Sequence, residues 1–256
     1  ATDRPTDECA RAMAEKSETR KSKAKWLPLE SDPEVFSRYA KALGCKNATF
    51  CDVFGLDADL LGMVPRPVLA VVLLFPIERE ERVEQAKAAP ASEASREGLF
   101  YIKQKIGNAC GTIALLHAIA NNTGTGGADA SSLQLEEDSF LAKLCEDCQA
   151  MSPDERADYL DAKAEAGLES AHNAAAVDDD KKGETITEED MSTNLHFVCY
   201  VEKNGKLWEL DGRNPAGPSA VADCAHAEVL EKSAQAIQKR MSASSSLQFS
   251  VMACNA

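Results

Sequence analysis

One of the nine cysteines, Cys110, has neighbours that suit a nucleophile. It is preceded by Gly107-Asn108-Ala109 and followed by Gly111-Thr112. The apolar segment after it extends to Asn122 and predicts a buried helix that begins at the cysteine. At a helix N-terminus, unpaired backbone N–H groups and the positive end of the helix dipole stabilise a thiolate, which is the nucleophilic form. The alternative is a buried cysteine that acts only as a small apolar side chain.

A nucleophilic thiol requires a base, and the chain has four histidines. His117 lies seven residues beyond Cys110 on the same predicted helix, about 10 Å along its axis, so we expect it in the core. His172 falls in a predicted loop and His226 near a helix start, and both are expected at the surface. Only His196 lies on a predicted strand, which makes it the candidate base.

His196 belongs to a predicted β-hairpin with a turn at Asn204-Gly205. A two-residue turn places Lys203 opposite Lys206. The same register puts His196 and Asp211 on one face of the sheet as diagonal neighbours. A carboxylate in that position would fix the tautomer of the imidazole and stabilise its protonated form. A three-residue loop would instead put Asp211 on the opposite face of the sheet. The alternative to a catalytic pair is that His196 is a surface histidine and Asp211 a residue of an Asp-Gly turn.

Gln104 lies six residues before Cys110, in a strand-like segment over 100–104. Its side-chain amide could form an oxyanion hole with the backbone N–H of Cys110, whereas a solvent-facing glutamine is the alternative. The C-x-x-C pair of Cys145 and Cys148 has neither a second pair at zinc spacing nor a strand-to-helix context. The sequence therefore predicts neither a metal site nor a redox motif there.

These candidate residues need a framework, and the sequence indicates a sheet between helices. Residues 68–75 are apolar at every position, which is typical of a strand covered on both faces. Asp32 is the predicted N-cap of a helix that ends at Gly44. Ser152 and Glu155 form a capping box for a helix that extends to about residue 166. The other predicted elements are a surface helix or loop over 79–98, hairpin strands over 195–201 and 206–210, a helix over 225–240 and a strand over 247–254.

Two segments are predicted to lack a fixed structure. Residues 1–25 are polar and charged, so we interpret them as a flexible N-terminal extension before one domain over 26–256. Residues 168–194 are rich in Ala, Asp, Glu and Lys and form a long connection directly before the hairpin. A connection of this length inside a domain is usually functional or disordered.

Composition narrows the classes of function. The chain has 256 residues and a formal net charge of −14, which argues against nucleic acid and favours a basic partner or simply solubility. Nine cysteines without paired spacing suit a reducing compartment. The longest apolar run has eight residues, whereas a membrane span needs about 20. We expect a soluble intracellular protein with no nucleic-acid or membrane partner.

Six separated motifs follow one another along the chain. They are Trp26-Leu27-Pro28-Leu29-Glu30, Met63-Val64-Pro65-Arg66-Pro67, Gln104 with Asn108-Ala109-Cys110-Gly111-Thr112, Met151-Ser152-Pro153, Leu195-His196-Phe197 and Glu209-Leu210-Asp211-Gly212-Arg213. Together they resemble the ubiquitin carboxyl-terminal hydrolases, and most closely the short, single-domain members. The resemblance extends from Trp26 to the C-terminus in the family's order.

This resemblance implies an α/β (α+β) fold of the papain-like cysteine peptidases, with a central antiparallel sheet flanked by helices and a knotted chain path. Residues 168–194 would be the family's crossover loop. Cys110 would be the nucleophile, His196 the base and proton donor, Asp211 the orienting acid and Gln104 the oxyanion donor, with no cofactor and no metal. We expect a monomer in the cytoplasm or nucleus, with ubiquitin as partner and NEDD8 as an additional candidate.

The implied reaction releases small or unfolded adducts from the C-terminal glycine of ubiquitin through a thioester, because the substrate tail must pass under the crossover loop. A ubiquitin-binding module with little or no turnover and a general papain-like protease are the alternatives. The resemblance also implies three ubiquitin-contacting segments. They comprise Pro28, Leu29, Glu30, Ser31, Asp32 and Pro33, then Ala171, His172 and Asn173, and finally Ser246, Leu247, Gln248 and Phe249.

Overall fold

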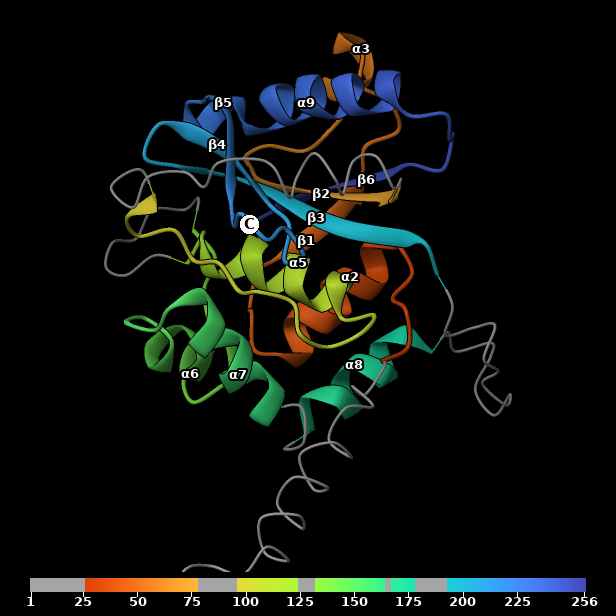
Figure 1. Ribbon diagram of the computed structural model, residues 1–256. Coiled ribbons are helices and arrows are strands. Elements are labelled where there is room, and N and C mark those ends of the chain that lie inside the picture. Colours follow the sequence, from red (N-terminus) through yellow and green to blue (C-terminus); the bar gives the residue numbers. More distant parts are fainter. Residues whose placement is uncertain (1–25, 78–95, 124–131, 164–166, 178–192) are drawn as a thin grey trace, which may run out of the picture.

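The computed structural model describes residues 26–77, 96–123, 132–163, 167–177 and 193–256. A six-stranded antiparallel sheet, in the order β1-β6-β2-β3-β4-β5, lies between helices (Figure 1). Three predicted segments lie outside the described residues. They are the extension 1–25, most of the 79–98 segment and residues 178–192 of the predicted crossover loop.

The strands are β1 (Thr49–Asp52), β2 (Val68–Pro76), β3 (Leu195–Lys203), β4 (Lys206–Leu210), β5 (Ser219–Asp223) and β6 (Ser250–Asn255). The helices are α2 (Pro33–Ala42), α3 (Ala58–Leu61), α5 (Cys110–Ala120), α6 (Phe140–Asp147), α7 (Pro153–Lys163), α8 (Glu169–Ala176), the 3₁₀ turn η5 (His226–Glu228) and α9 (Val229–Ala243).

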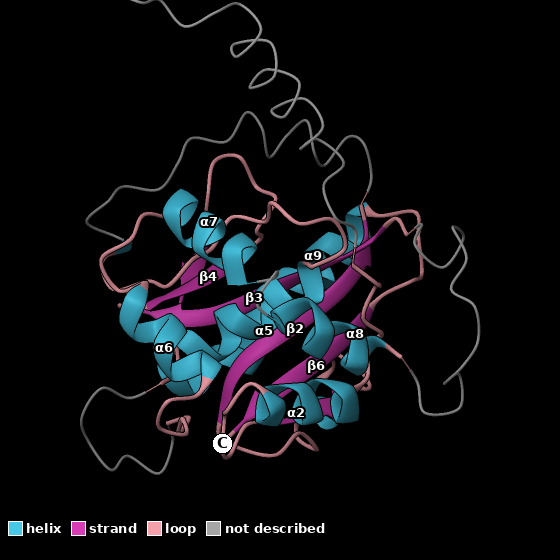
Figure 2. Cartoon of the chain, turned by 90° about the horizontal axis from the view of Figure 1, so that it is seen from below, coloured by secondary structure: helices cyan, strands magenta, loops and turns pink. Residues whose placement is uncertain are grey.

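Strand β2 is buried on both faces, as its continuous apolar sequence predicts. Leu69 and Val72 join the core that lies against α2 and α5, whereas Val71 and Leu73 join a second core that lies against α9. Figure 1 shows α9 on one side of the sheet and α2 and α5 on the other. Figure 2 looks onto the second side, where α6, α7 and α8 also gather. The sheet is therefore a central layer, and α5 packs against one of its faces.

The hairpin has the predicted register. Lys203 pairs with Lys206, and the ladder continues to the pair Cys199 and Leu210. Asn204 and Gly205 have φ of 55° and 75°, the left-handed conformations that a two-residue hairpin turn of this type requires. This turn fixes which residues of β3 and of the segment after β4 share a face.

Two of the predicted helix starts show the expected caps. Asp32 accepts hydrogen bonds from the N–H groups of Glu34 and Val35 at 2.7 and 3.1 Å. Ser152 and Glu155 bond reciprocally, with backbone-to-side-chain distances of 2.8 and 3.3 Å. Both helices therefore begin where side-chain oxygens satisfy their first N–H groups.

Three predicted elements differ from the structure. Residues 100–104 form no strand, because Ile102 donates its N–H to His117 Nε2 at 2.9 Å and Gln104 donates its N–H to Gly212 at 2.8 Å instead of pairing in a ladder. The last strand begins at Ser250 rather than at residue 247, because serine side chains accept the N–H groups of residues 246 and 248 locally. The helix predicted over 225–240 is a 3₁₀ turn followed by α9, which ends at Ala243. Strands β1 and β5 and the short helix α3 were not predicted.

The fourth difference concerns the segment before the hairpin. Residues 169–176, predicted to lack a fixed structure, form α8. Their alanine content favours a helix, and His172 and Ala175 bury one of its faces. The prediction for the first part of the segment is thus wrong, since composition alone does not reveal a helix that is stabilised by tertiary packing.

Among the described residues, no helix combines the length and apolar character that crossing a bilayer requires.

Candidate active site

Cys110 is the first residue of α5, as predicted, and only 6% of its surface is exposed. Asn108 precedes it with a φ of 59°, a left-handed conformation that asparagine adopts more readily than most residues. The side chain of Asn108 donates to the carbonyl oxygen of Trp26 at 3.0 Å, which holds the turn in place. Ala109 occupies the N-cap position and offers no side-chain acceptor to the first turn. The first N–H groups of α5 therefore lack a side-chain cap and can stabilise negative charge beside the thiol.

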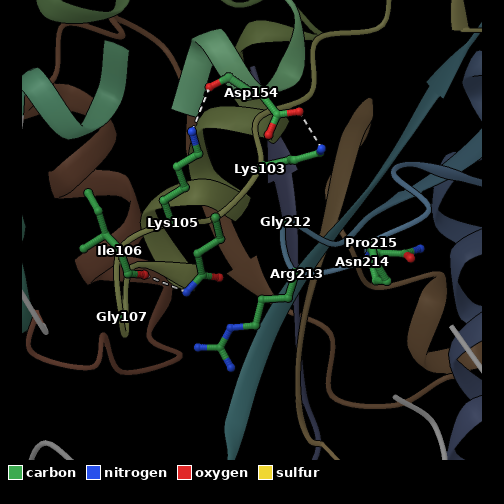
Figure 3. Close-up of a pocket in the computed structure, with 10 residues that line it drawn as sticks. Lys103, Lys105, Ile106, Gly107, Asp154, Gly212, Arg213, Asn214 and Pro215 are labelled. Carbon is green, nitrogen blue, oxygen red and sulfur yellow. Dashed lines mark hydrogen bonds and ion pairs between the residues drawn. The ribbon is translucent and has the colours of Figure 1, made fainter. Parts of the chain in front are cut away.

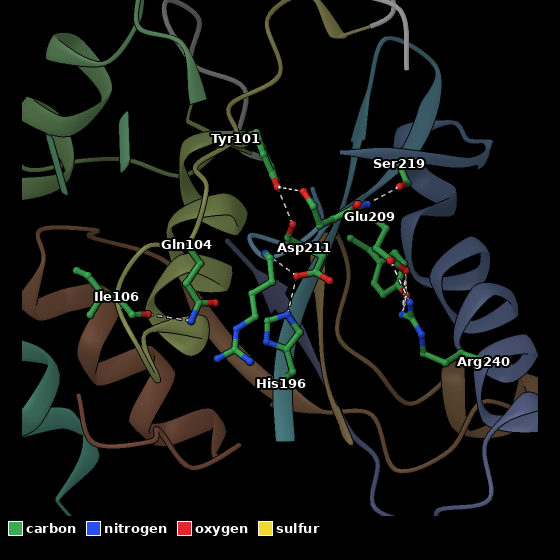
Figure 4. A network of polar contacts seen from close by, with 11 residues as sticks. Tyr101, Gln104, Ile106, His196, Glu209, Asp211, Ser219 and Arg240 are labelled. Atoms are coloured by element: carbon green, nitrogen blue, oxygen red, sulfur yellow. Dashed lines mark hydrogen bonds and ion pairs between the residues drawn. The ribbon is translucent and has the colours of Figure 1, made fainter. Parts of the chain in front are cut away.

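His196 and Asp211 meet as the hairpin register predicts (Figure 4). Nε2 of His196 and Oδ1 of Asp211 are 2.6 Å apart, and both side chains are almost fully buried. The same carboxylate oxygen accepts the backbone N–H of Arg213 at 2.8 Å. The hydroxyl of Tyr101 donates to the backbone carbonyl of Asp211 at 2.7 Å. Two hydrogen bonds thus hold the carboxylate in the position that orients the imidazole, and a third holds the backbone of Asp211.

The electrostatics of the site favour an ion pair between thiol and imidazole. Burial alone raises the pKa of the Cys110 thiol, but the polar contact with His196 and its charge, with smaller contributions from the Phe197 N–H and Arg213, outweigh it and lower the pKa. Burial alone lowers the pKa of His196, but the contacts with Asp211 and Cys110 raise it to about 9. These opposite shifts stabilise a thiolate beside an imidazolium.

No hydrogen bond of ordinary length reaches Nδ1 of His196 from the described residues. The thiol of Cys110 nevertheless lies close to the imidazole, since a polar contact with Cys110 and its charge raise the pKa of His196. Contacts of this kind often shorten only when substrate binds. The structure therefore brings Cys110, His196 and Asp211 together as a candidate triad.

This geometry is that of a cysteine hydrolase, and comparison with known protein families agrees. The family model described as ubiquitin carboxyl-terminal hydrolase, family 1, matches residues 26–242. The chain belongs to that family. The predictions of the family and of a thiol hydrolase are thereby confirmed.

Curated relatives and a solved structure support the same assignment. Ubiquitin carboxyl-terminal hydrolase 3 of Arabidopsis thaliana is 40% identical over 247 residues, which cover 94% of this chain and 98% of that protein. Human ubiquitin carboxyl-terminal hydrolase isozyme L1 is 35% identical over 195 residues, which cover 73% and 79%. The Trichinella spiralis UCH37 catalytic domain, solved bound to ubiquitin vinyl methyl ester, matches with a TM-score of 0.72 at 21% identity and covers 91% of this chain and 96% of that one. The last match confirms the predicted fold.

In this ubiquitin carboxyl-terminal hydrolase family member, Gln104 lies beside the candidate triad (Figure 4). Its backbone N–H bonds the carbonyl of Gly212, the residue after Asp211. Its side-chain Nε2 donates to the carbonyl of Ile106 at 3.0 Å, while Oε1 is buried without a hydrogen-bond partner among the described residues. The amide group is therefore oriented by the loop before Cys110, and its oxygen is buried.

The three segments implied to contact ubiquitin converge in the structure. Ser31 Oγ donates to Ser250 Oγ at 2.9 Å, which joins the first segment to the start of β6. His172 Nε2 donates to the carbonyl of Leu27 at 2.6 Å, which joins α8 to the residue before the first segment. Leu247 is 95% exposed, and Glu30 and Gln248 are exposed as well. The first segment therefore lies next to both α8 and the start of β6.

Two residues of this predicted set are buried. Leu29 packs on Gly111 at the start of α5, where a Cβ on the glycine would approach its side chain to 2.8 Å. His172 has no exposed surface, and burial lowers its pKa to about 4. The prediction of a surface position for His172 is therefore wrong, because its side chain packs its segment in place, whereas the ubiquitin contacts of Leu29 and His172 stay predictions.

His172 ends a chain of buried hydrogen bonds that the sequence did not reveal. Its Nδ1 accepts from the hydroxyl of Thr112 at 2.7 Å, since Nε2 already donates to a carbonyl and the ring is neutral. Tyr39 lies 3.2 Å from the same hydroxyl. Thr112 is two residues beyond Cys110, so the chain joins α2 and α8 to the first turn of α5. His117 is buried and His226 exposed, as predicted.

A second supporting cluster was also missed. Arg240 on α9 forms two hydrogen bonds with Glu209, at 2.9 and 3.0 Å, and Glu209 also accepts from the hydroxyl of Tyr200 at 2.6 Å. The guanidinium lies 4.5 Å from the ring centre of Phe75, and the rings of Phe75 and His196 form a T-shaped pair. Glu209 belongs to a family motif, but no local pattern pairs it with an arginine 31 residues away.

Proposed function

We propose that this protein is a thiol-dependent ubiquitin hydrolase that releases small or unfolded adducts from the C-terminal glycine of ubiquitin. Cys110 is the nucleophile, His196 the base and proton donor, Asp211 the orienting acid and Gln104 an oxyanion donor. The observation that carries the proposal is the buried His196 and Asp211 pair beside a thiol whose pKa is lowered at the N-terminus of α5. The family membership and a relative solved with a ubiquitin derivative supply the substrate.

In the first half of this mechanism, the Cys110 sulfur attacks the glycine carbonyl and forms a C–S bond. The negative charge on the carbonyl oxygen is stabilised by the N–H of Cys110 and the amide of Gln104. The C–N bond then breaks, and the imidazolium of His196 gives its proton to the leaving amine. In the second half, neutral His196 takes a proton from water, which attacks the thioester and releases the ubiquitin carboxylate and the thiolate.

The direct test uses a ubiquitin probe whose C-terminus carries an electrophile, followed by mass spectrometry of the modified protein. We expect a single adduct on Cys110, because it is the described cysteine whose pKa is lowered, whereas burial raises the pKa of Cys45, Cys51 and Cys254. A matching NEDD8 probe, run side by side, measures the preference between the two modifiers. Labelling of another cysteine, or no labelling by either probe, would contradict the proposal.

The described cysteines are all free thiols, which supports our proposal that the protein works in a reducing compartment, the cytoplasm or nucleus. Exposed Leu247 and its neighbours supply a surface for ubiquitin next to the candidate triad. An inactive ubiquitin-binding module would also use this surface, but it would not need a thiol with a lowered pKa. The hydrolase is therefore the function that the site favours.

The activity should depend on pH in a bell-shaped manner. As pH falls through the lowered pKa of the Cys110 thiol, the thiolate takes up a proton and attack stops. As pH rises through about 9, His196 loses the proton that it gives to the leaving amine. The two apparent values belong to the coupled pair and not to either residue. Rates of cleavage of a fluorogenic ubiquitin amide across this range check it, with circular dichroism as a control for folding, and a flat profile from neutral into acid would contradict it.

Replacement of Gln104 with alanine should lower kcat by about 10²- to 10³-fold, with a smaller effect on KM, because an oxyanion donor acts mainly in the transition state. Gln134→Ala, which removes an exposed glutamine amide on another loop, serves as the matched control and should leave kcat unchanged. Steady-state rates on the same ubiquitin amide give both values. If kcat for Gln104→Ala stays within about twofold of the unmodified protein, Gln104 is only a structural residue.

A further inference from the structure

A pocket of about 620 Å³ opens beside the candidate triad (Figure 3). The loop over 103–107 forms one wall and includes Gln104, and the turn over 212–215, directly after Asp211, forms the other. Asp154 of α7 lies at its rim. Because Gln104 belongs to both the pocket wall and the candidate oxyanion hole, a group in this pocket lies next to the reacting carbonyl.

The pocket is locally positive, although the protein as a whole is acidic. Lys103 pairs with Asp154 at 2.6 Å, and Lys105 pairs with Asp158. The guanidinium of Arg213 makes no hydrogen bond or ion pair with any residue that the structure describes, and it extends away from Asp154 in Figure 3. Three cations against two carboxylates leave one positive charge, and Arg213 supplies it.

The order of the strands places this pocket opposite the proposed ubiquitin surface. Ser250 at the start of β6 pairs with Leu74 of β2, which pairs with Phe197 of β3, so the segment 246–249 lies on the β6 side of His196. Arg213 follows β4, on the other side of β3. A ubiquitin molecule that covers 246–249 and delivers its terminal carbonyl to Cys110 would therefore leave the pocket to the group on the far side of the scissile bond.

We propose that this pocket receives the leaving group and that Arg213 makes it select adducts with an acidic residue next to the bond that is cleaved. The proposal rests on the proposed hydrolase function and extends it to the substrate class. A carboxylate on the leaving group would pair with a guanidinium that has no partner among the described residues. A basic leaving group would meet the uncompensated charge of Arg213 and would be disfavoured.

The test uses three ubiquitin fusions whose short C-terminal peptides differ only in the residues after the scissile bond, which are glutamates, serines or lysines. The measured quantity is the ratio of kcat/KM between fusions for one enzyme preparation, so that any general effect of Arg213 on the thiol cancels. We expect the unmodified protein to prefer the glutamate over the lysine fusion by about two- to fivefold, the range of an exposed charge pair. Arg213→Gln should bring this ratio close to one, and Arg213→Glu should invert it.

Arg66→Gln is the matched control, because Arg66 is an exposed arginine that pairs with Glu231 of α9 on the other side of the sheet. It should keep the preference of the unmodified protein. A ratio near one for the unmodified protein, or a ratio that Arg213→Gln leaves unchanged, would overturn the role of the pocket while the hydrolase stands. Failure to cleave all three fusions would overturn the hydrolase, and this proposal with it.

Discussion

Replacement of Cys110 with alanine should abolish cleavage of ubiquitin amides while binding of ubiquitin persists. The substitution removes only the sulfur atom, on a side chain with 6% of its surface exposed, so the surrounding fold has little reason to change. Loss of a nucleophile that acts as a unit with its base should lower kcat by at least about 10⁴-fold. A fluorogenic ubiquitin amide measures the turnover, and isothermal titration calorimetry with ubiquitin measures the affinity.

Cys145→Ala is the matched control for this experiment. Cys145 is a half-buried thiol on α6 whose pKa is raised by burial, so its removal should leave turnover unchanged. Three outcomes separate the candidate functions. Turnover that survives Cys110→Ala would exclude Cys110 as the nucleophile. Ubiquitin binding without turnover in the unmodified protein would indicate a binding module. Cleavage of unfolded casein would indicate a general protease.

The part of the site that was predictable from sequence depends on short-range geometry. His196 and Asp211 are only 15 residues apart, and the Asn204-Gly205 turn fixes their relative position through the alternation of a strand. Cys110 could likewise be placed at a helix N-terminus from the glycines and apolar residues around it. Residue spacing did not predict that this helix N-terminus lies beside the hairpin. That prediction depended on the family resemblance.

The features that the sequence did not reveal arise where distant segments pack on each other. Leu29 is buried because Gly111, 82 residues later, leaves room for it, and His172 is buried because the carbonyl of Leu27 and the hydroxyl of Thr112 satisfy its two nitrogens. A polar residue in an alanine-rich segment gives no sign of such partners. The pairing of Arg240 with Glu209 was missed for the same reason.

Charge gives a further contrast between sequence and structure. The formal net charge of −14 indicates an acidic protein and, from the sequence alone, a basic or unspecified partner. The pocket beside Gln104 has the opposite local sign, because Asp154 and Asp158 neutralise the two lysines and leave Arg213. Whole-chain charge thus influences long-range association, whereas selection at the scissile bond depends on a few neighbouring side chains.

The second large effect should come from Asp211, and its size should depend on the replacement. Asp211→Ala removes the acceptor that lies 2.6 Å from Nε2 of His196 and should lower kcat/KM by about 10³- to 10⁴-fold. Burial lowers the pKa of His196, and Asp211 is the largest of the influences that raise it to about 9. Without the carboxylate the imidazole becomes a weaker base, so the alkaline limb of the pH profile should also move to lower pH.

Asp211→Asn separates the orienting role of this residue from its charge. The backbone N–H of Arg213 donates to Oδ1 at 2.8 Å, so an asparagine would keep its carbonyl oxygen at that position, where it can still accept from Nε2. We therefore expect the asparagine variant to retain activity within about tenfold at its optimum, as an asparagine serves in other cysteine proteases, while its alkaline limb moves as in the alanine variant. Asp223→Ala, at an exposed carboxylate paired with Lys206, should change neither quantity. Equal losses for alanine and asparagine would mean that the negative charge, and not the orientation of the imidazole, is the larger contribution of Asp211.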